Sequence, residues 1–182
     1  MDSVGKTFFR SLKGKTLVVR SHSFTAKFLH WAFIAVFAFG VINQVDELEE
    51  LESPTLLAGE VIFAMIFLSL LLFRFLYMQS ARAAMPQLDM SKNLILLART
   101  VHLGMYASLA LIGITGLVIG GLYYLGVKEG LVLEAILLLH EITFWISVNL
   151  MGLHIAGAIY HRLQEDGVWS AMVPILREES DN

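Results

Sequence analysis

The chain has 182 residues, of which 57% are hydrophobic and only 16% are charged, and it contains no cysteine. A water-soluble domain of this size usually carries more charge, and the lack of cysteine excludes disulfides, iron–sulfur clusters, zinc–thiolate sites and covalent haem attachment. The net charge is −3, the sequence has no phosphate-binding loop, and its basic residues form no patch of the kind that binds nucleic acid, so nucleic acid is not an expected partner. A membrane protein is the class that remains.

Four apolar stretches follow one another along the chain, and each is long enough to cross a bilayer as a helix. They cover residues 26–45, 55–78, 94–125 and 131–160. The last two exceed the length that a bilayer requires, so we expect them to tilt or to project into water. The first stretch has no small-residue cleavage site after it, which favours a retained span over a signal peptide. The sequence therefore predicts an all-α fold, an integral membrane four-helix bundle in contact with lipid.

Lysine and arginine are concentrated before the first stretch and between the second and the third. The connection after the first stretch, QVDELEELESP, has neither, and the third connection has only Lys128. The positive-inside rule then places both termini in the cytoplasm. We expect a basic cytoplasmic segment over 1–25, the bundle over 26–164 and a cytoplasmic tail over 165–182.

The fourth stretch carries three histidines, His140, His154 and His161. An α-helix turns 100° and rises about 1.5 Å per residue, so His140 and His154 lie about 21 Å apart along the axis and about 40° apart around it. His161 continues the same stripe. Imidazoles are costly in hydrocarbon, and ionisable side chains inside a membrane usually bind or transfer something.

The inner half of the predicted bundle offers two imidazole pairs. His30 lies about a turn and a half into the first stretch, level with His154, and His102 of the third stretch also falls in the inner half. Two histidines from facing helices at one depth are the usual axial ligands of a b-type haem in a four-helix bundle. Arg74 is a predicted partner for the haem propionates, with Arg99 next.

The outer half holds one histidine, His140, at the level of Glu60 on the second stretch, with Met65 just deeper. Not every histidine of the spans needs a cofactor. His102 taken alone can hydrogen-bond across a helix interface, and His161 fits an interfacial histidine better than a ligand. The glycines of the spans fit ordinary helix packing as well as close approach of a flat macrocycle.

Four short motifs in this order resemble the bacterial cytochrome b561 family, which takes in the cytochrome b subunits of nickel–iron hydrogenases and formate dehydrogenases. They are HW in the first stretch, VHLGMY…GITG in the third, and HE followed by GLH in the fourth. The resemblance covers residues 21–174, including EDGVWSAMVP. It implies a multi-pass protein of the bacterial inner membrane with four helices, two haems b near the two membrane faces, and electron exchange with quinone.

The resemblance also implies ligands. The inner haem would be held by His30 and His154, and His140 would be one ligand of the outer haem. The family's other outer ligand is a histidine 14 residues before the position of Arg74, where this chain has Glu60. A second haem with two histidine ligands is therefore not expected in the family's usual form.

Three outcomes are open for the outer site. The haem is absent and His140 forms a hydrogen bond with Glu60, or it is present with Glu60 or Met65 as a substitute ligand, or it is five-coordinate with a free position for a small molecule. Carboxylate is a poor axial ligand for a low-spin electron carrier. Loss or alteration of the outer haem therefore ranks above a normal outer haem. Glu60 is also consistent with a carboxyl that handles protons beside a haem or quinone.

The leading functional hypothesis is a membrane cytochrome that transfers electrons between the quinone pool and a redox partner, with quinone oxidoreductase activity left open. His102 is the candidate for a contact with quinone or a propionate. The alternative is a haem-bearing anchor subunit of a larger dehydrogenase or other membrane complex. A haem-free transporter or scaffold ranks lower.

The connection after the first span forms an acidic patch that we expect outside the cell membrane. It is either an ordinary solvated loop or a docking surface for a cationic periplasmic redox protein. Its charge would repel superoxide, which argues against a superoxide:quinone oxidoreductase. The acidic residues are Asp46, Glu47, Glu49, Glu50 and Glu52.

Overall fold

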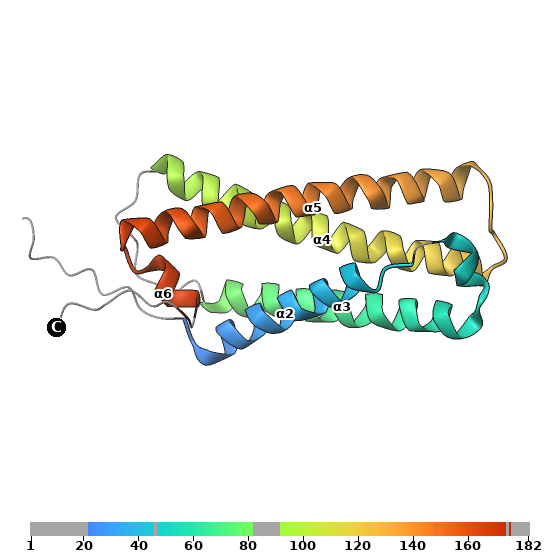
Figure 1. Ribbon diagram of the computed structural model, residues 1–182, viewed down its shortest axis with the longest axis horizontal. Coiled ribbons are helices and arrows are strands. Elements are labelled where there is room, and N and C mark those ends of the chain that lie inside the picture. The colour runs from blue at the N-terminus through green and yellow to red at the C-terminus, as the bar shows by residue number, and fades with distance from the viewer. Residues whose placement is uncertain (1–21, 46, 82–91, 174, 176–182) are drawn as a thin grey trace, which may run out of the picture.

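The computed structural model describes residues 22–45, 47–81, 92–173 and 175, and these residues form helices and turns with no strand (Figure 1). The long helices are α2 (Phe24–Ile42), α3 (Pro54–Ala81), α4 (Lys92–Tyr124) and α5 (Leu131–Gln164). The short ones are η1 (Leu48–Glu52) and α6 (Val168–Met172).

All four long helices are long and apolar enough to cross a membrane. Many of their large apolar side chains point away from the bundle, among them Phe28, Leu103 and Leu153. A protein surrounded by water would bury such a surface, whereas lipid suits it. The predicted all-α membrane bundle is confirmed.

The ends of the spans follow from local sequence. Pro54 occupies the first position of α3, where its missing N–H costs no hydrogen bond. α4 ends where Gly126 adopts a positive φ of 81°, and the N–H of Val127 donates to the Leu122 carbonyl oxygen (2.8 Å). This tight turn sends α5 back antiparallel to α4.

The helices pack in chain order, α2 on α3, α3 on α4 and α4 on α5. Figure 1 shows α2 and α3 along one side of the molecule and α4 crossing α5 along the other. Within the described residues α2 makes at most isolated close backbone approaches to α4 or α5. The seam between the first and last spans is therefore bridged by side chains.

Small residues let α4 lie close to both of its neighbours. A Cβ atom at Gly113 would lie 2.7 Å from the Leu68 side chain of α3, and one at Gly104 would lie 3.1 Å from Leu150 of α5. Close backbone approach at small residues is a common way to pack membrane helices. Next to these crossings lies an apolar core made of Phe33, Phe67, Leu71 and Leu109.

We call the end of the bundle at which α2 begins the inner end, and the opposite end the outer end. At the inner end α6 lies beside the start of α2 (Figure 1), and the N–H of His22 donates to the carbonyl oxygen of Ala171 (3.1 Å). The segment predicted as a tail, 165–182, thus contains a packed helix. It joins the end of the last span to the start of the first.

Replacing Gly113 by alanine should lower the free energy of unfolding by about 1–3 kcal/mol, because the added methyl group overlaps Leu68 in a packed interface. Gly121 is the matched control, since a Cβ atom there meets nothing within 4 Å. Denaturation of both variants in detergent provides the measurement. Equal stability of the two would show that the α3–α4 crossing is looser than described.

Candidate functional site

Three imidazole rings meet in the inner half of the bundle. His30 comes from α2, His102 from α4 and His154 from α5, and all three are partly buried. The ring centre of His154 lies 6.4 Å from that of His30 and 4.8 Å from that of His102. The structure therefore brings together the first and last spans at the level that the sequence predicted.

The two distances distinguish the two predicted pairs. A metal ion bonded at about 2 Å to one nitrogen of each ring would hold the ring centres roughly 6–6.5 Å apart. The separation of His30 and His154 fits this arrangement, whereas His102 lies too close to His154 for the two rings to bind one ion from opposite sides.

The donor set suits haem better than a bare ion. No group of three or more His, Asp or Glu side chains that could hold a metal ion occurs in the described ranges. A structural or catalytic ion held by protein alone usually needs at least three ligands. Because a porphyrin supplies four nitrogens itself, two axial histidines are sufficient for haem.

Of the three rings, that of His154 has the fewest hydrogen-bond partners. It contacts the rings of His30 and His102, but it makes no hydrogen bond within the described part of the chain. A polar nitrogen without a partner is costly in an apolar environment. Coordination of iron would remove that cost.

Arg74 of α3 reaches into the same cluster. Its Nη1 lies 2.6 Å from Nδ1 of His30, and its Nε donates to the hydroxyl oxygen of Tyr106 (3.2 Å). A guanidinium group can only donate, so Nδ1 of His30 accepts, and a neutral His30 ring carries its proton on Nε2. The predicted propionate partner is thus bonded to a predicted iron ligand.

His102 is held differently. Its Nδ1 lies 2.6 Å from the carbonyl oxygen of Ala98, one turn earlier in α4. A carbonyl oxygen only accepts, so Nδ1 carries the proton and Nε2 keeps its lone pair. His102 therefore presents a hydrogen-bond acceptor close to His154.

His140 lies nearer the outer end and contacts α4. Its Nδ1 is 2.8 Å from the hydroxyl oxygen of Thr115, which donates its own proton to the Leu111 carbonyl oxygen (2.8 Å). Thr115 must then accept from His140, so Nε2 of His140 also keeps its lone pair. Gly116 of α4 lies against the ring, since a Cβ atom there would be in van der Waals contact with the His140 Cε1 atom at 3.7 Å.

Glu60 and Met65 do not contact His140 through any hydrogen bond in the described residues. Glu60 is partly buried on α3, and the partner of His140 is Thr115. Met65 is 48% exposed. The hydrogen-bonded pair of His140 and Glu60, one of the three predicted outcomes, is therefore not the arrangement seen.

The remaining predicted residues lie toward the inner end. Arg99 is exposed on α4. His161, in the last turn of α5, pairs with Asp166 (Nδ1 to Oδ2, 2.6 Å), whose other oxygen accepts from the N–H of Val168 at the start of α6. His161 thus fixes the turn into α6 and lies outside the imidazole cluster.

Partial burial, with the positive charges of Lys27 and Arg74, lowers the pKa of His22 below its ordinary value. The ring is therefore neutral at pH 7. Next to it, the hydroxyl groups of Ser23 and Tyr77 lie 2.7 Å apart and join the start of α2 to the end of α3. Polar groups of α2 and α3 are thus hydrogen-bonded to each other at the inner end.

Sequence reasoning missed two residues, Tyr106 and Thr115. Tyr106 follows His102 by four residues, which places both on one face of α4. Thr115 lies between the two glycines of the GITG motif. Both act by fixing another side chain, so neither has the ligand chemistry for which a motif is searched.

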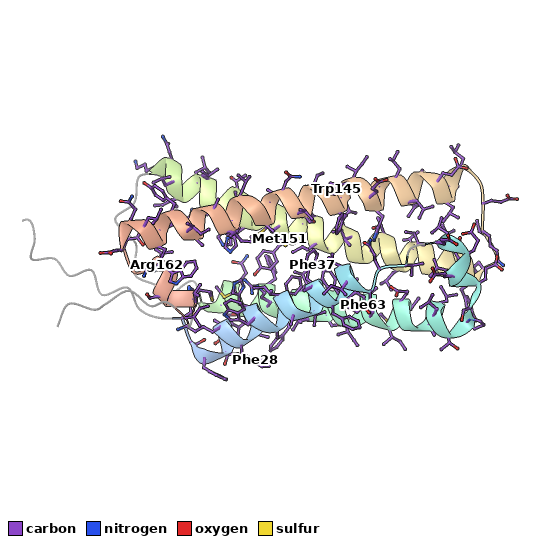
Figure 2. All side chains as sticks on the ribbon, in the orientation of Figure 1. Phe28, Phe37, Phe63, Trp145, Met151 and Arg162 are labelled. Carbon is purple, nitrogen blue, oxygen red and sulfur yellow. The ribbon has the colours of Figure 1, made fainter. Side chains whose placement is uncertain are left out.

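Figure 2 shows where several large side chains of α2 and α5 lie. Phe28 and Trp145 point away from the bundle on opposite sides, and both are more than half exposed. Phe37 and Met151 lie in the same view between the ribbons of α2 and α5. In this view apolar side chains thus lie between the first and last spans.

Four apolar spans, of which the first and the last place the ring centres of His30 and His154 6.4 Å apart, define an integral membrane four-helix protein with a candidate haem site. The family model of the prokaryotic cytochrome b561 matches residues 21–174, and the chain belongs to this family. No curated protein and no solved structure matches it. Membership makes the chain a multi-pass bacterial inner-membrane protein that binds b-type haem and transfers electrons.

Thr115→Val should lower the free energy of unfolding by about 0.5–1.5 kcal/mol more than Thr143→Val does, because it removes the hydroxyl oxygen that accepts from the Nδ1–H of His140 across the helix interface. Thr143 is a matched control: it is equally buried, and its hydroxyl donates only to the Leu139 carbonyl oxygen of its own helix. Thermal unfolding in detergent is the measurement. A larger loss in the Thr143 variant would contradict the role given to Thr115.

Proposed function

We propose that this protein carries electrons between the quinone pool and a redox partner by means of a haem b held by His30 and His154. The observation that supports this most strongly is the 6.4 Å separation of the two ring centres, on residues from the first and last spans. When bound, haem supplies a one-electron redox centre. The two histidines would hold it between α2 and α5, whose backbones lack close contacts in the described residues.

The inner end is proposed to face the cytoplasm. The described cations Lys27, Arg74 and Arg99 lie toward this end, whereas the acidic η1 lies at the outer end. This distribution follows the positive-inside rule. Both chain termini and the connection between α3 and α4 are then cytoplasmic.

Arg74 and His102 are proposed to serve the inner site. Arg74 supplies a positive charge next to His30 that can pair with a propionate carboxylate. His102 presents the lone pair of Nε2 beside His154, which suits acceptance of a hydrogen bond from a quinol hydroxyl. Electrons and a bound quinol would then meet within one cluster.

The outer site is proposed to keep a haem in altered form, with His140 as its single strong ligand. The support is the hydrogen bond to Thr115, which orients the ring as second partners orient metal-binding histidines and leaves Nε2 available. Glu60, where the family has its second histidine, would leave the opposite position weakly bound or open.

Haem counting tests the outer site. We expect two haems per chain by pyridine haemochrome assay against protein concentration, and one in His140→Ala, with loss of a high-spin component that binds carbon monoxide. Glu60→Ala should retain both haems. One haem in the unmodified protein, unchanged by His140→Ala, would mean that the outer site is empty.

The acidic patch is proposed to be a docking surface for a cationic periplasmic redox protein. Leu51 is buried and anchors η1 to the bundle, and Glu52 pairs with Lys128 (2.8 Å), so the patch is held on a fixed turn. Glu49 and Glu50 remain exposed. Complementary charge would speed encounter with such a partner, and the same charge disfavours superoxide as a substrate.

A second candidate function is that of a haem-bearing anchor subunit in a larger complex. The turn between α4 and α5 exposes three large side chains at the outer end, Tyr124, Leu125 and Leu131, each at least 75% exposed. Exposed apolar groups at such a position favour a partner protein. Copurification of a stoichiometric partner in mild detergent would support the anchor over a free-standing carrier.

The inner ligands are tested by replacing each histidine. His30→Ala and His154→Ala should each abolish the low-spin b-type spectrum of the inner haem, whereas His102→Ala should keep most of it, because His102 lies too close to His154 to share an iron with it. Reduced-minus-oxidised spectra of purified protein are the measurement.

His161→Ala is the control, since its partner is Asp166. If His102→Ala were the variant that lost the spectrum, the assignment of His30 would be wrong. A colourless unmodified protein would favour a haem-free scaffold.

A further inference from the structure

Arg74 is a charged group inside a span, and both of its hydrogen-bond partners are neutral. Nη1 contacts His30 of α2 and Nε contacts Tyr106 of α4, so the guanidinium group connects three helices. The ion pairs of the described residues involve other groups, and none includes Arg74. A cation placed among apolar helices without an anion is energetically expensive.

We propose that Arg74 is an exchange residue: its hydrogen bond to Nδ1 of His30 and coordination of iron by His30 exclude each other, so Arg74 would move from His30 to a carboxylate of the cofactor. The hydrogen bond from Nε of Arg74 to Tyr106 would remain while Nη1 leaves His30. The inference rests on the proposed role of His30.

The first reason is the proton count on His30. A neutral imidazole has one N–H, and Arg74 can only donate, so that proton lies on Nε2 while the bond to Arg74 exists. To bind iron through Nε2, the ring must move its proton to Nδ1. Two N–H groups would then face each other, so Arg74 must leave.

The second reason is that binding of iron through Nδ1 of His30 would break the same hydrogen bond. Binding through Nδ1 would need the lone pair that Arg74 already occupies at 2.6 Å. Whichever nitrogen of a neutral His30 binds iron, the bond to Arg74 breaks. No net proton is gained or lost, because the ring only shifts its proton from one nitrogen to the other.

The third reason is the tether. Tyr106 holds Nε, and its ring packs edge-on against Phe75, the residue after Arg74, with ring centres 5.1 Å apart. When Nη1 is released, the guanidinium group stays in the cluster through this contact. It then has free N–H donors that suit a carboxylate, in the geometry that arginine uses for bidentate pairs.

One consequence is an order of availability. His154 makes no hydrogen bond in the described residues, whereas His30 is occupied. His154 is therefore the ligand that is ready first. His30 would become available as a ligand only after its hydrogen bond to Arg74 breaks.

The test uses the full chain, made in a haem-deficient host and placed in lipid nanodiscs, with haemin and haemin dimethyl ester as probes. The ester lacks free carboxylates, so it reports on the release of His30 alone. The variants are Arg74→Met, which cannot donate a hydrogen bond, and Arg162→Met as a control at the end of α5.

In the cofactor-free protein, nitrogen-15 NMR of the histidines, assigned with His30→Ala, should show His30 protonated on Nε2. In Arg74→Met the proton of His30 should no longer prefer Nε2 over Nδ1. The ester should bind about tenfold faster to Arg74→Met than to the unmodified protein or to Arg162→Met, because one charge-assisted hydrogen bond no longer has to break. Haemin should bind tighter than its ester to the unmodified protein, and this preference should vanish in Arg74→Met.

Two results would overturn the exchange: His30 protonated on Nδ1 in the cofactor-free chain, or equal ester rates in Arg74→Met and Arg162→Met. If Arg74→Met fails to fold, Tyr106→Phe takes its place, with Tyr160→Phe as control, and loss of the haemin preference in Tyr106→Phe alone is expected. Unchanged preference in Tyr106→Phe would contradict the tether. A low-spin spectrum that survives in His30→Ala would instead refute the proposed function, whatever the NMR shows.

Discussion

An imidazole nitrogen without a hydrogen bond is costly in hydrocarbon, and this cost governs the inner half of the bundle. Three histidines of the spans avoid this cost through different hydrogen bonds. His102 bonds to a carbonyl of its own helix, His140 to a threonine of the neighbouring helix, and His30 to Arg74. His154 alone lacks such a partner in the described residues, and it lies at coordination distance from His30.

The architecture leaves the seam that holds this pair without close backbone packing. α4 packs tightly on both α3 and α5 at small residues such as Gly104 and Gly113, while α2 packs on α3 and leaves its seam with α5 to side chains. α6 ties the end of α5 to the start of α2 at the inner end. A bundle closed equally on all sides would have no place for a macrocycle between its first and last helices.

Much of this arrangement could be predicted from the sequence. The length of each apolar stretch defines the spans, and the position of a residue within its helix defines its depth in the membrane. The 14-residue spacing of His140 and His154 and the place of His30 early in its span follow from those two rules. The contacts of Arg74 with His30 and Tyr106 do not, since they depend on how each helix is rotated and on side-chain torsions. The same holds for Thr115, whose role arises only because α4 and α5 cross there.

The inner and outer sites differ in a way that Glu60 indicates in the sequence and the hydrogen bonds make specific. The inner site has two histidines at coordination distance, whereas the outer site has one oriented histidine and a carboxyl that makes no hydrogen bond to it in the described residues. The central claim is the inner pair. An experimental structure of the pigment-bearing protein tests it most directly: we expect iron bonded to one nitrogen of His30 and one of His154, and rings turned apart with only lipid or side chains between them would contradict it.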